Sequence, residues 1–340
     1  MSSRPSLLSL ALLFALAGAE PVLGQASPLR FESRDCTDCI WLKGNTHTHT
    51  TESDGDSSPD YVARWYNDHG YDFLILSDHN VLIDTGTLGH LMDSTFLLIP
   101  GEEVTSSFED KPVHVNGLNL QELVDPKKGT TLVGTIQANV DAIRQEHGVP
   151  HVNHPNYAWA FGAHELGQVE NDRLLEIFNG HPSVHNQGGG GYPGMEEIWD
   201  VLLTRGKRIF GIAVDDAHHF QGEFSQDRIN PGRGWVVVNA PALEAGPIME
   251  ALEAGRFYAS TGVILDDVVV SGSRLEVHIR PLGSFKFTTT FIGSGGRVLK
   301  KVHGPNAVFE LEAPEAYVRA RVEDSGGSVA WVQPVWVDGG

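Results

Sequence analysis

The sequence predicts an α/β barrel followed by a small all-β domain, and three observations lead to this fold class. Short apolar runs alternate with helical patterns between residues 40 and 255, as in strands buried on both faces of a parallel sheet. Polar clusters rich in His, Asp and Glu follow those runs, where the predicted strands end. From about residue 263 onward, apolar runs separated by Gly, Ser and Pro replace the helical period, which indicates a sandwich-like domain.

Length and net charge limit the number of domains and the classes of partner that this chain can have. The 340 residues, of which 41% are hydrophobic, suffice for one large domain and one small one. The formal net charge of −20 argues against a general nucleic-acid-binding surface, because such a surface needs Lys and Arg to neutralise phosphates. The charge is compatible with a phosphorylated substrate, since bound metal ions supply local positive charge.

The N-terminal residues 1–26 have the pattern of a secretory signal. Arg4 gives a positive start, the apolar run 7–17 is too short for a comfortable membrane span, and small residues follow. We therefore expect an exported protein, periplasmic or extracellular, with no membrane association after signal removal. The expected domains are a hydrolase barrel at residues 27–262 and a β-rich domain at residues 263–340.

Two cysteines occur in the motif C-T-D-C, at Cys36 and Cys39. A local disulfide is the leading interpretation for an exported protein. A redox dithiol, or a zinc site completed by His47 and His49, remains an alternative.

The elements of the barrel can be predicted in order from apolar runs and terminator residues. Helices are expected from Ser58 and Pro59 to about residue 69, and at residues 135–147, 193–204 and 247–254. Strands are expected at residues 40–47, 73–76, 96–99, 113–120, 149–152, 174–178, 209–214 and 235–239. The β domain is expected to contain strands at 268–270, 275–279, 285–291, 307–311, 317–322 and 330–337.

Metal-ligating side chains recur where these strands end. In the motif H-T-H, His47 and His49 stand two residues apart, so on a strand both imidazoles point to the same face. Each candidate alone has a structural alternative, such as a turn formed by Asp54 and Gly55. A barrel, however, brings the carboxyl ends of its strands onto one rim. The candidates on this rim therefore predict a multinuclear metal site: His47, His49, Asp54, His79, Glu103, His114, His154, Asp216 and His218.

These motifs resemble those of a known superfamily. H-T-H-T, S-D-G, S-D-H-N, G-E-E-V-T, H-V-N-G, N-H-P and D-D-A-H occur in this order between residue 43 and about residue 220. The ordered set resembles the PHP (polymerase and histidinol phosphatase) superfamily. The resemblance implies a distorted seven-stranded β/α barrel that holds two or three divalent ions of manganese, zinc or iron.

The resemblance also implies which residues hold which ion. One ion would be held by His47, His49, Glu103 and Asp216, and Glu103 would bridge to a second ion held also by His114 and His154. Asp54, His79 and His218 would hold the third. The family patterns select Glu103 over Glu102, Asp216 over Asp215 and His218 over His219, pairs that spacing alone leaves open.

The later half of the chain is similar to exported PHP-type hydrolases of the carbaryl-hydrolase group. The similarity lies in G-R-F-Y-A-S-T-G at residues 255–262, Y-V-R-A-R-V-E-D from Tyr317 and A-W-V-Q-P from Ala330. This group cleaves a carbamate ester, whereas most of the superfamily cleaves phosphoesters, so the two halves point to different substrates.

The expected function is metal-dependent hydrolysis of a small-molecule phosphomonoester or phosphodiester. Two ions, held by Glu103 and Asp216 among others, would generate a bridging hydroxide as the nucleophile. A carboxyl- or carbamate-ester hydrolase on the same site is an alternative, and a non-catalytic metal- or ligand-binding module is another. Amidohydrolase barrels share H-x-H but lack the S-D-H and G-E-E-V clusters of this sequence. The sequence contains no G-x-S-x-G elbow, which argues against a serine hydrolase.

Loop residues supply candidates for contacts with the substrate. His181, His185 and His219 are candidate proton donors to the leaving group, and Arg228 and Arg233 are candidate phosphate contacts. For all five, a plain surface role is the competing interpretation.

Overall fold

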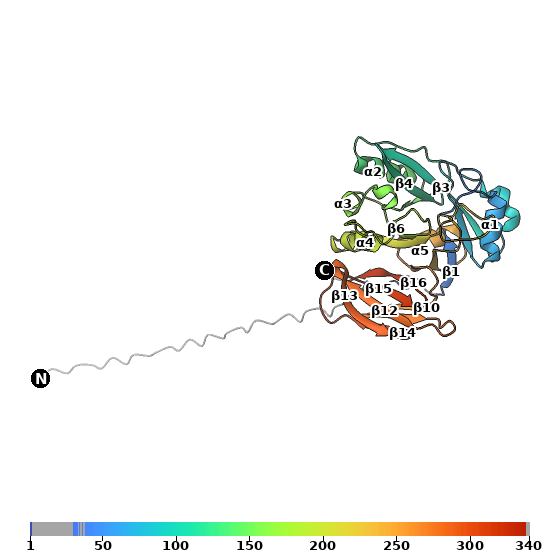
Figure 1. The fold of residues 1–340 in the computed structure, drawn as a ribbon. Coiled ribbons are helices and arrows are strands. Elements are labelled where there is room, and N and C mark those ends of the chain that lie inside the picture. Colours follow the sequence, from blue (N-terminus) through green and yellow to red (C-terminus); the bar gives the residue numbers. More distant parts are fainter. Residues whose placement is uncertain (2–29, 33, 35, 37, 338–340) are drawn as a thin grey trace.

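An α/β unit and a layer of C-terminal strands are joined by one continuous sheet in the computed structural model (Figure 1). The structure describes residue 1 and residues 30–337 except 33, 35 and 37, so the predicted signal segment after Met1 lies outside the described residues. Within the described part, no helix is long and apolar enough to cross a membrane.

The α/β unit contains the first eight strands. They are β1 (Ile40–Asn45), β2 (Phe73–Leu76), β3 (Leu97–Phe108), β4 (Lys111–Leu118), β5 (Val149–Val152), β6 (Leu174–Asn179), β7 (Phe210–Val214) and β8 (Trp235–Ala240). The pairs β1–β2, β2–β3, β5–β6 and β6–β7 are parallel, while β4 runs antiparallel to β3 and β5. β8 pairs antiparallel with β1. The terminal strand β7 contacts β8, so the sheet curls round on itself.

Helices cover this curled sheet, and the residues at their ends explain where they begin. They are α1 (Pro59–Asp68), α2 (Leu132–Gln145), α3 (Ala163–Leu166), α4 (Met195–Thr204) and α5 (Ala245–Glu253), with 3-10 turns η1 (Thr85–Leu91), η2 (Tyr157–Trp159) and η3 (Ser294–Gly296). The side chains of Ser58 and Thr131 accept hydrogen bonds from backbone N–H groups at the starts of α1 and α2, and Pro59 opens α1.

Strand β3 is longer than the apolar run 96–99 predicts. It continues through the polar stretch to Phe108 because Gly101–Phe108 pairs antiparallel with Lys111–Leu118. The predicted cluster G-E-E-V-T therefore lies inside a strand, not after it. Alternation along β3 then sends Glu102 and Glu103 to opposite faces of the sheet.

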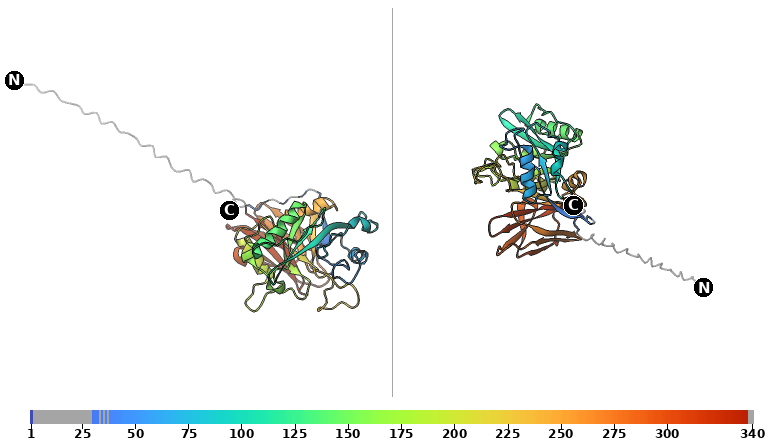
Figure 2. Two further views of the ribbon diagram at one scale, coloured as in Figure 1. Left: turned by 90° about the horizontal axis from the view of Figure 1, so that it is seen from above. Right: turned by 90° about the vertical axis from the view of Figure 1, so that its right-hand side faces the viewer.

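The C-terminal strands confirm a mixed α/β fold followed by antiparallel β structure. Strands β9 (Phe257–Ser260), β12 (Phe287–Gly293), β13 (Arg297–His303), β15 (Tyr317–Asp324) and β16 (Val329–Trp336) continue the large sheet beyond β8. Strands β10 (Leu265–Ser271), β11 (Arg274–Ile279) and β14 (Asn306–Glu310) form a second, three-stranded sheet. The right-hand view of Figure 2 shows the C-terminal strands, in orange to red, beneath the α/β unit.

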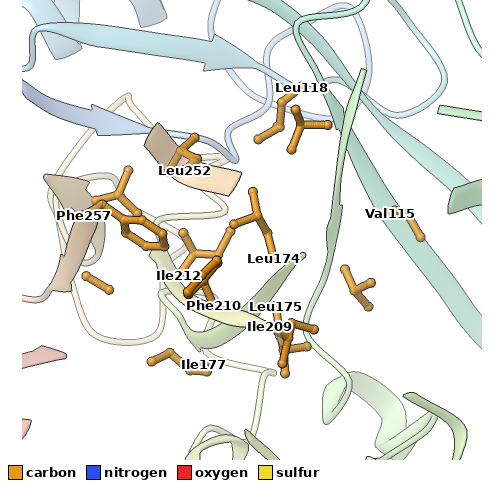
Figure 3. Close-up of a cluster of buried hydrophobic side chains, with 14 of the residues drawn as sticks. Val115, Leu118, Leu174, Leu175, Ile177, Ile209, Phe210, Ile212, Leu252 and Phe257 are labelled. Carbon is orange, nitrogen blue, oxygen red and sulfur yellow. The ribbon is translucent and has the colours of Figure 1, made fainter. Parts of the chain in front are cut away.

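Apolar side chains from many elements fill the core of the α/β unit. Figure 3 shows Val115 and Leu118 of β4, Leu174 of β6 and Ile212 of β7, with Leu252 of α5. All of these side chains are buried. Burial of this kind is worth about 1.5–3 kcal/mol per large apolar side chain, so the core fixes the strands whose ends carry the polar clusters.

Two polar contacts also tie the C-terminal strands to the α/β unit. The buried guanidinium of Arg319 on β15 donates two hydrogen bonds to Asp200 on α4, at 2.8 and 2.7 Å. The side-chain amide of Gln333 donates to Gly211 O and accepts from Gly211 N on β7. The amide thus satisfies backbone groups at the edge of the large sheet.

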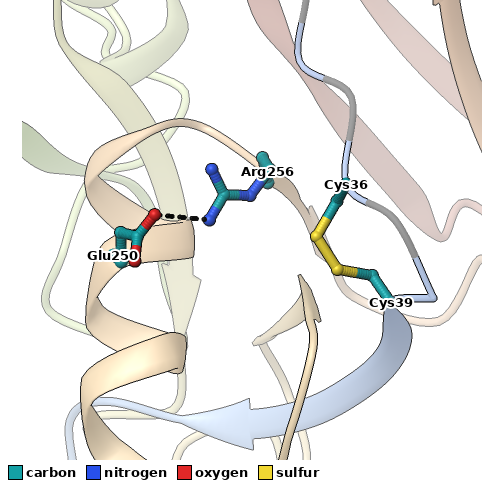
Figure 4. Close-up of a disulfide and its surroundings, with 4 residues drawn as sticks. All are labelled: Cys36, Cys39, Glu250 and Arg256. Atoms are coloured by element: carbon teal, nitrogen blue, oxygen red, sulfur yellow. Dashed lines mark hydrogen bonds and ion pairs between the residues drawn. A yellow bond between two sulfur atoms is a disulfide. The ribbon is translucent and has the colours of Figure 1, made fainter.

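Cys36 and Cys39 form the local disulfide that the sequence predicts, just before β1 (Figure 4). Because the two cysteines bond each other, they supply no thiolate to a metal site near His47 and His49.

Candidate metal centre

His47 and His49 lie just beyond the end of β1, side by side in a buried segment. The backbone continues alongside the end of β7, where His49 N donates to Ala217 O and Thr48 forms a parallel bridge with Ala217. Both imidazoles are fully buried. Their ring centroids are 5.2 Å apart, so the two rings converge on one region, as the spacing predicts.

The carboxylate of Glu103 lies between the imidazoles of this region. Its Oε2 lies 3.4 Å from His47 Nε2, 3.3 Å from His49 Nε2 and 2.9 Å from His79 Nδ1. Its Oε1 lies 2.9 Å from His114 Nδ1 and 3.4 Å from His154 Nε2. The two oxygens thus face different sets of imidazoles, which is the arrangement required of a carboxylate that bridges two ions.

Asp216 and Asp54 provide two further carboxylates beside these imidazoles. Asp216 Oδ1 is 3.2 Å from both His47 Nε2 and His49 Nε2. Asp54 Oδ1 is 3.2 Å from His218 Nε2, and Asp54 Oδ2 is 3.6 Å from His79 Nε2. The fold therefore brings together all nine side chains that the sequence singled out as metal ligands.

The donor atoms of these side chains fit metal ions. Four groups place their N and O atoms within 4.8 Å of one another: His49, Asp54, His79 and His218; His47, His49 and Asp216; His47, Glu103 and His154; His79, Glu103 and His114. Ligand bonds of about 2.0–2.2 Å put neighbouring donors on a tetrahedral ion roughly 3.4 Å apart. Several of these atoms are buried without a hydrogen-bond partner, namely His47 Nε2, His49 Nε2, Glu103 Oε2 and His114 Nδ1.

Orphaned buried nitrogens and oxygens are costly in a protein interior, and divalent ions remove that cost. The His, Asp and Glu clusters therefore suggest divalent metal binding. Asp54, His79 and His218, which the resemblance assigns to the third ion, form one of these groups together with His49. How the other ligands divide among ions stays a prediction.

The structure also shows which member of each adjacent pair faces the centre. Glu102 points away and accepts from Val124 N, while Glu103 faces the imidazoles. Asp215 accepts hydrogen bonds from Tyr66 Oη and from the backbone N–H groups of residues 232, 233 and 234. Asp216 reaches the centre because its backbone adopts a φ of 50°, a left-handed conformation that costs about 1–3 kcal/mol for such a residue.

Surrounding imidazoles favour the ionised form of the carboxylates. Burial opposes ionisation of Glu103, but the nearby His47 and His114 hold its pKa well below the ordinary value. Burial likewise opposes ionisation of Asp216, yet His47 and His49 keep its pKa well below the ordinary value. Burial, together with the charge of His218, lowers the pKa of His49 to about 4, so this ring is a neutral ligand near neutral pH.

A second layer of polar residues holds the candidate ligands, and sequence reasoning missed most of it. Glu176 lies within the apolar strand β6 and is fully buried; its Oε1 is 2.7 Å from His47 Nδ1. Asp78 accepts hydrogen bonds from Thr50 N, Thr50 Oγ1 and Ser53 Oγ. Asn153 donates to Glu103 Oε1 at 2.8 Å. A lone acidic residue inside L-L-E-I-F-N was the sequence signal that could have identified Glu176.

Tyr157 and His181 line the mouth of the centre. Both contribute to the cavity bounded by Asp54, His79, Glu103, His114, His154, Asp216 and His218. The Tyr157 ring lies 5.3 Å from that of His154 and 6.1 Å from that of His181. The next two residues, Ala158 and Trp159, have φ values of 51° and 52°, so Tyr157 sits in a strained turn beside the site.

The five predicted substrate contacts occupy different places. Of these, His181 alone lines the cavity of the centre. His185 is exposed and stacks on Trp159, and His219 Nδ1 accepts from Ile229 N. Arg228 donates to Gln221 O, and Arg233 donates to Gly180 O and Ser225 O. Both guanidinium groups thus hold loops in place.

Comparisons with known proteins bear on the fold. No family model matches the chain. An uncharacterized protein from Chlamydia muridarum (strain MoPn / Nigg) is 25% identical over 219 residues, which span 50% of this chain and 35% of that relative. A two-domain protein from Bacteroides vulgatus, described as containing a predicted PHP-like metal-dependent phosphoesterase, matches with a TM-score of 0.51 and 16% identity. That match covers 88% of this chain and 95% of the neighbour.

Two further solved structures are less similar. One is a putative metal-dependent phosphoesterase from Bifidobacterium adolescentis, with a TM-score of 0.39 and 12% identity over 55% of this chain and 89% of that chain. The other is an amidohydrolase from Chromobacterium violaceum, with a TM-score of 0.37 and 16% identity over 63% of this chain and 96% of that chain. The first match, which covers most of both chains, shows that this chain shares the fold of that neighbour, an α/β unit followed by antiparallel strands, as the sequence predicted.

Proposed function

We propose that this protein is an exported, metal-dependent phosphoesterase that binds two or three divalent ions of manganese, zinc or iron. The observation that carries the proposal is a set of four metal-sized donor groups linked through His47, His49, His79 and Glu103. All of their members except His47 and His49, which lie buried behind it, line one cavity. A binding protein needs no such shared, multinuclear ligand set beside an open cavity. Similarity to a protein described as containing a predicted PHP-like phosphoesterase supports the phosphoester over other substrates.

The ions would supply two effects when bound: they lower the pKa of a water molecule, and they stabilise negative charge on the phosphoryl oxygens. The ligands are His47, His49, Asp54, His79, Glu103, His114, His154, Asp216 and His218. Glu103 presents its two oxygens to different imidazoles, so it would contribute a ligand atom to each of two neighbouring ions. Glu176 holds His47 by its Nδ1 atom, which leaves Nε2 directed at the centre.

His181 is suited to bind the substrate as a hydrogen-bond donor. Ser183 N donates to His181 Nδ1 at 3.0 Å, so this nitrogen carries no proton in the neutral ring. Burial lowers the pKa of His181, which favours the neutral ring. The proton then resides on Nε2, and this group can donate to a phosphoryl or leaving-group oxygen in the cavity that His181 lines.

Hydrolysis of a carbamate or carboxyl ester is the second candidate function. It is favoured by one observation: among the described residues, no Lys or Arg lines the cavity of the centre. A neutral ester needs less positive charge than a phosphoester does. A non-catalytic binding role is the third candidate.

The test combines metal analysis with a substrate panel. Purified protein is loaded in turn with manganese, zinc and iron, and its metal content is measured by elemental analysis. The panel contains chromogenic phosphomonoesters, phosphodiesters, carboxyl esters and a carbamate ester. We expect more than one ion per chain and faster turnover of phosphoesters. At most one ion after supplementation would exclude the multinuclear site, and turnover of carboxyl or carbamate esters alone would reverse the ranking.

A further inference from the structure

Two surface hollows open beside the metal centre. The β6 hollow, about 660 Å³ in volume, is lined by Phe178, His181, Val184, Phe224, Ser225 and Pro231, among others. The β3 hollow, about 570 Å³, is lined by Thr105, Ser107, His114, Pro126, Lys128 and Tyr157, among others. Either volume falls within the range of about 300–1,000 Å³ that small-molecule sites occupy.

Each hollow shares wall residues with the cavity of the centre. The β6 hollow shares His181, and the β3 hollow shares His114 and Tyr157. In the sheet order, β3 and β4 lie on one side of β5, and β6 and β7 lie on the other. The hollows therefore extend from different sides of the centre, and a phosphorus atom held there has room for a substituent on each side.

The charges around the centre favour a substrate with a single negative charge. None of the described residues that line the central cavity is Lys or Arg. Arg233 lines the β6 hollow, but its guanidinium donates to Gly180 O and Ser225 O. A phosphodiester carries one negative charge near neutral pH, whereas a phosphomonoester carries nearly two. Because no protein cation lines the cavity, a phosphodiester leaves less uncompensated negative charge there than a phosphomonoester does.

The walls of the two hollows differ in chemistry. Phe178, Val184, Phe224 and Pro231 give the β6 hollow an apolar wall that suits an aromatic or aliphatic substituent. The β3 hollow has a mixed wall, in which the charged and hydroxyl groups of Ser107, Glu109, Asp110 and Lys128 accompany apolar surface from residues such as Pro126 and Tyr157. A substituent in the β3 hollow can therefore form hydrogen bonds as well as bury apolar surface.

We propose that the substrate is a phosphodiester that places one apolar substituent in the β6 hollow and its second substituent in the β3 hollow. This inference rests on the proposed phosphoesterase function. Water adds to phosphorus, one P–O bond to a substituent breaks, and that substituent leaves as an alcohol after taking up a proton. The other substituent stays on the product, a phosphomonoester.

The first test compares two ligand pairs on the metal-loaded, full-length protein. Hydrolysis of bis(p-nitrophenyl) phosphate is compared with that of p-nitrophenyl phosphate, and calorimetric binding of diphenyl phosphate with that of phenyl phosphate. We expect kcat/KM for the diester to exceed that for the monoester about tenfold, and diphenyl phosphate to bind more tightly. Preference for the monoester would overturn the diester inference and leave the phosphoesterase standing. Hydrolysis of neither ester would overturn both.

The second test blocks each hollow with the same substitution. Ser225→Trp fills the β6 hollow and Ser107→Trp fills the β3 hollow, while Ser284→Trp, on an exposed loop of the C-terminal part, is the matched control. Each blocking variant should weaken diphenyl phosphate binding and raise KM for the diester about tenfold. The control should change neither, and phenyl phosphate should respond to at most one of the blocking variants.

Melting temperature and metal content of each variant, compared with the unmodified protein, show whether the fold and the centre are intact. A folded, metal-loaded Ser225→Trp or Ser107→Trp variant with unchanged diester binding would overturn the two-hollow inference. A variant that fails to fold is replaced by the smaller change Ser→Leu at the same position. Hydrolysis of p-nitrophenyl phosphate by all three variants would show that a failed diester test leaves the proposed function intact.

Discussion

His47 Nδ1 lies 2.7 Å from Glu176 Oε1, and both side chains are fully buried. Glu176 Oε2 also accepts hydrogen bonds from His154 N and Asn179 Nδ2. The carboxylate thus fixes the ring of one candidate ligand and the backbone of another. A proton on His47 Nδ1 leaves the Nε2 lone pair free for a metal ion.

Replacement of Glu176 by Gln should weaken metal binding while the fold is retained. The amide is close in size to the carboxylate but lacks its charge, so it holds the His47 ring less firmly. We expect metal affinity to fall roughly 10- to 100-fold, measured by competition with a chromogenic chelator. Glu312→Gln, an exposed position in the C-terminal part, is the control. Unchanged affinity in the Glu176 variant would show that the contact is not needed to orient His47.

Simultaneous replacement of His47 and His49 by Ala should abolish metal binding at most of the donor groups of the centre. Three of the four donor groups contain one or both of these residues, and His79, Glu103 and His114 form the group that remains. We expect at most one ion per chain by elemental analysis, and loss of hydrolysis by more than about a hundredfold. The control variant replaces His278 and His303, which lie on strands β11 and β13. Full activity in the His47 and His49 variant would exclude this centre as the catalytic site.

Glu102 should make stability depend on pH. Burial raises the pKa of this carboxyl to about 7 from its ordinary 4.5; the bond from Val124 N opposes the shift and the charge of Asp125 adds to it. The folded protein therefore holds this proton more tightly than the unfolded chain does. The resulting contribution to stability is complete below pH 4.5 and is lost as the pH rises through 7.

Glu102→Gln, which cannot ionise, tests this pH dependence. At pH 8 the variant should be more stable than the unmodified protein, by on the order of 3 kcal/mol in the free energy of unfolding. The difference should shrink as the pH falls and approach zero below pH 4.5. Urea denaturation at several pH values measures it, with the exposed Glu122→Gln as the control. A difference that does not vary with pH would contradict a raised pKa.

Removal of Asp200, one partner of the buried ion pair with Arg319, should lower the free energy of unfolding. Loss of the Asp200 carboxylate leaves a buried guanidinium without its main partner, although Glu196 still contacts it at 3.1 Å. We expect Asp200→Ala to lower the free energy of unfolding by about 3 kcal/mol. Asp266→Ala, which breaks the exposed pair with Arg280, should cost less than about 1 kcal/mol. Equal effects of the two substitutions in chemical denaturation would show that the buried pair has no special role.

Most of the fold class could be predicted because its signals are local. Apolar runs such as 73–76 and 149–152 become the strands Phe73–Leu76 and Val149–Val152 without change of bounds. The start of α1 at Ser58 follows from capping chemistry that acts over a few residues, whereas α2 begins at Leu132, three residues before its predicted start, because Thr131 caps it. The candidate ligands were recognisable for the same reason, since imidazoles and carboxylates occur in short motifs, although Glu103 and His114 lie within strands and not at their ends.

Local signals along the chain therefore place most of the helices and strands, although they miss β9, β13 and α3. They also identify the candidate ligands, with the family resemblance selecting one member of each adjacent pair. The way in which the ligands come together depends on contacts between distant residues. The pairing of β3 with β4 extends β3 through Glu103, so that Glu102 points to the opposite face of the sheet. The tertiary structure also places Glu176 against His47, 129 residues away, and joins the C-terminal strands to the same sheet. The physical reason is that spacing along the chain fixes only local direction, whereas contacts between distant residues depend on the register in which strands pair.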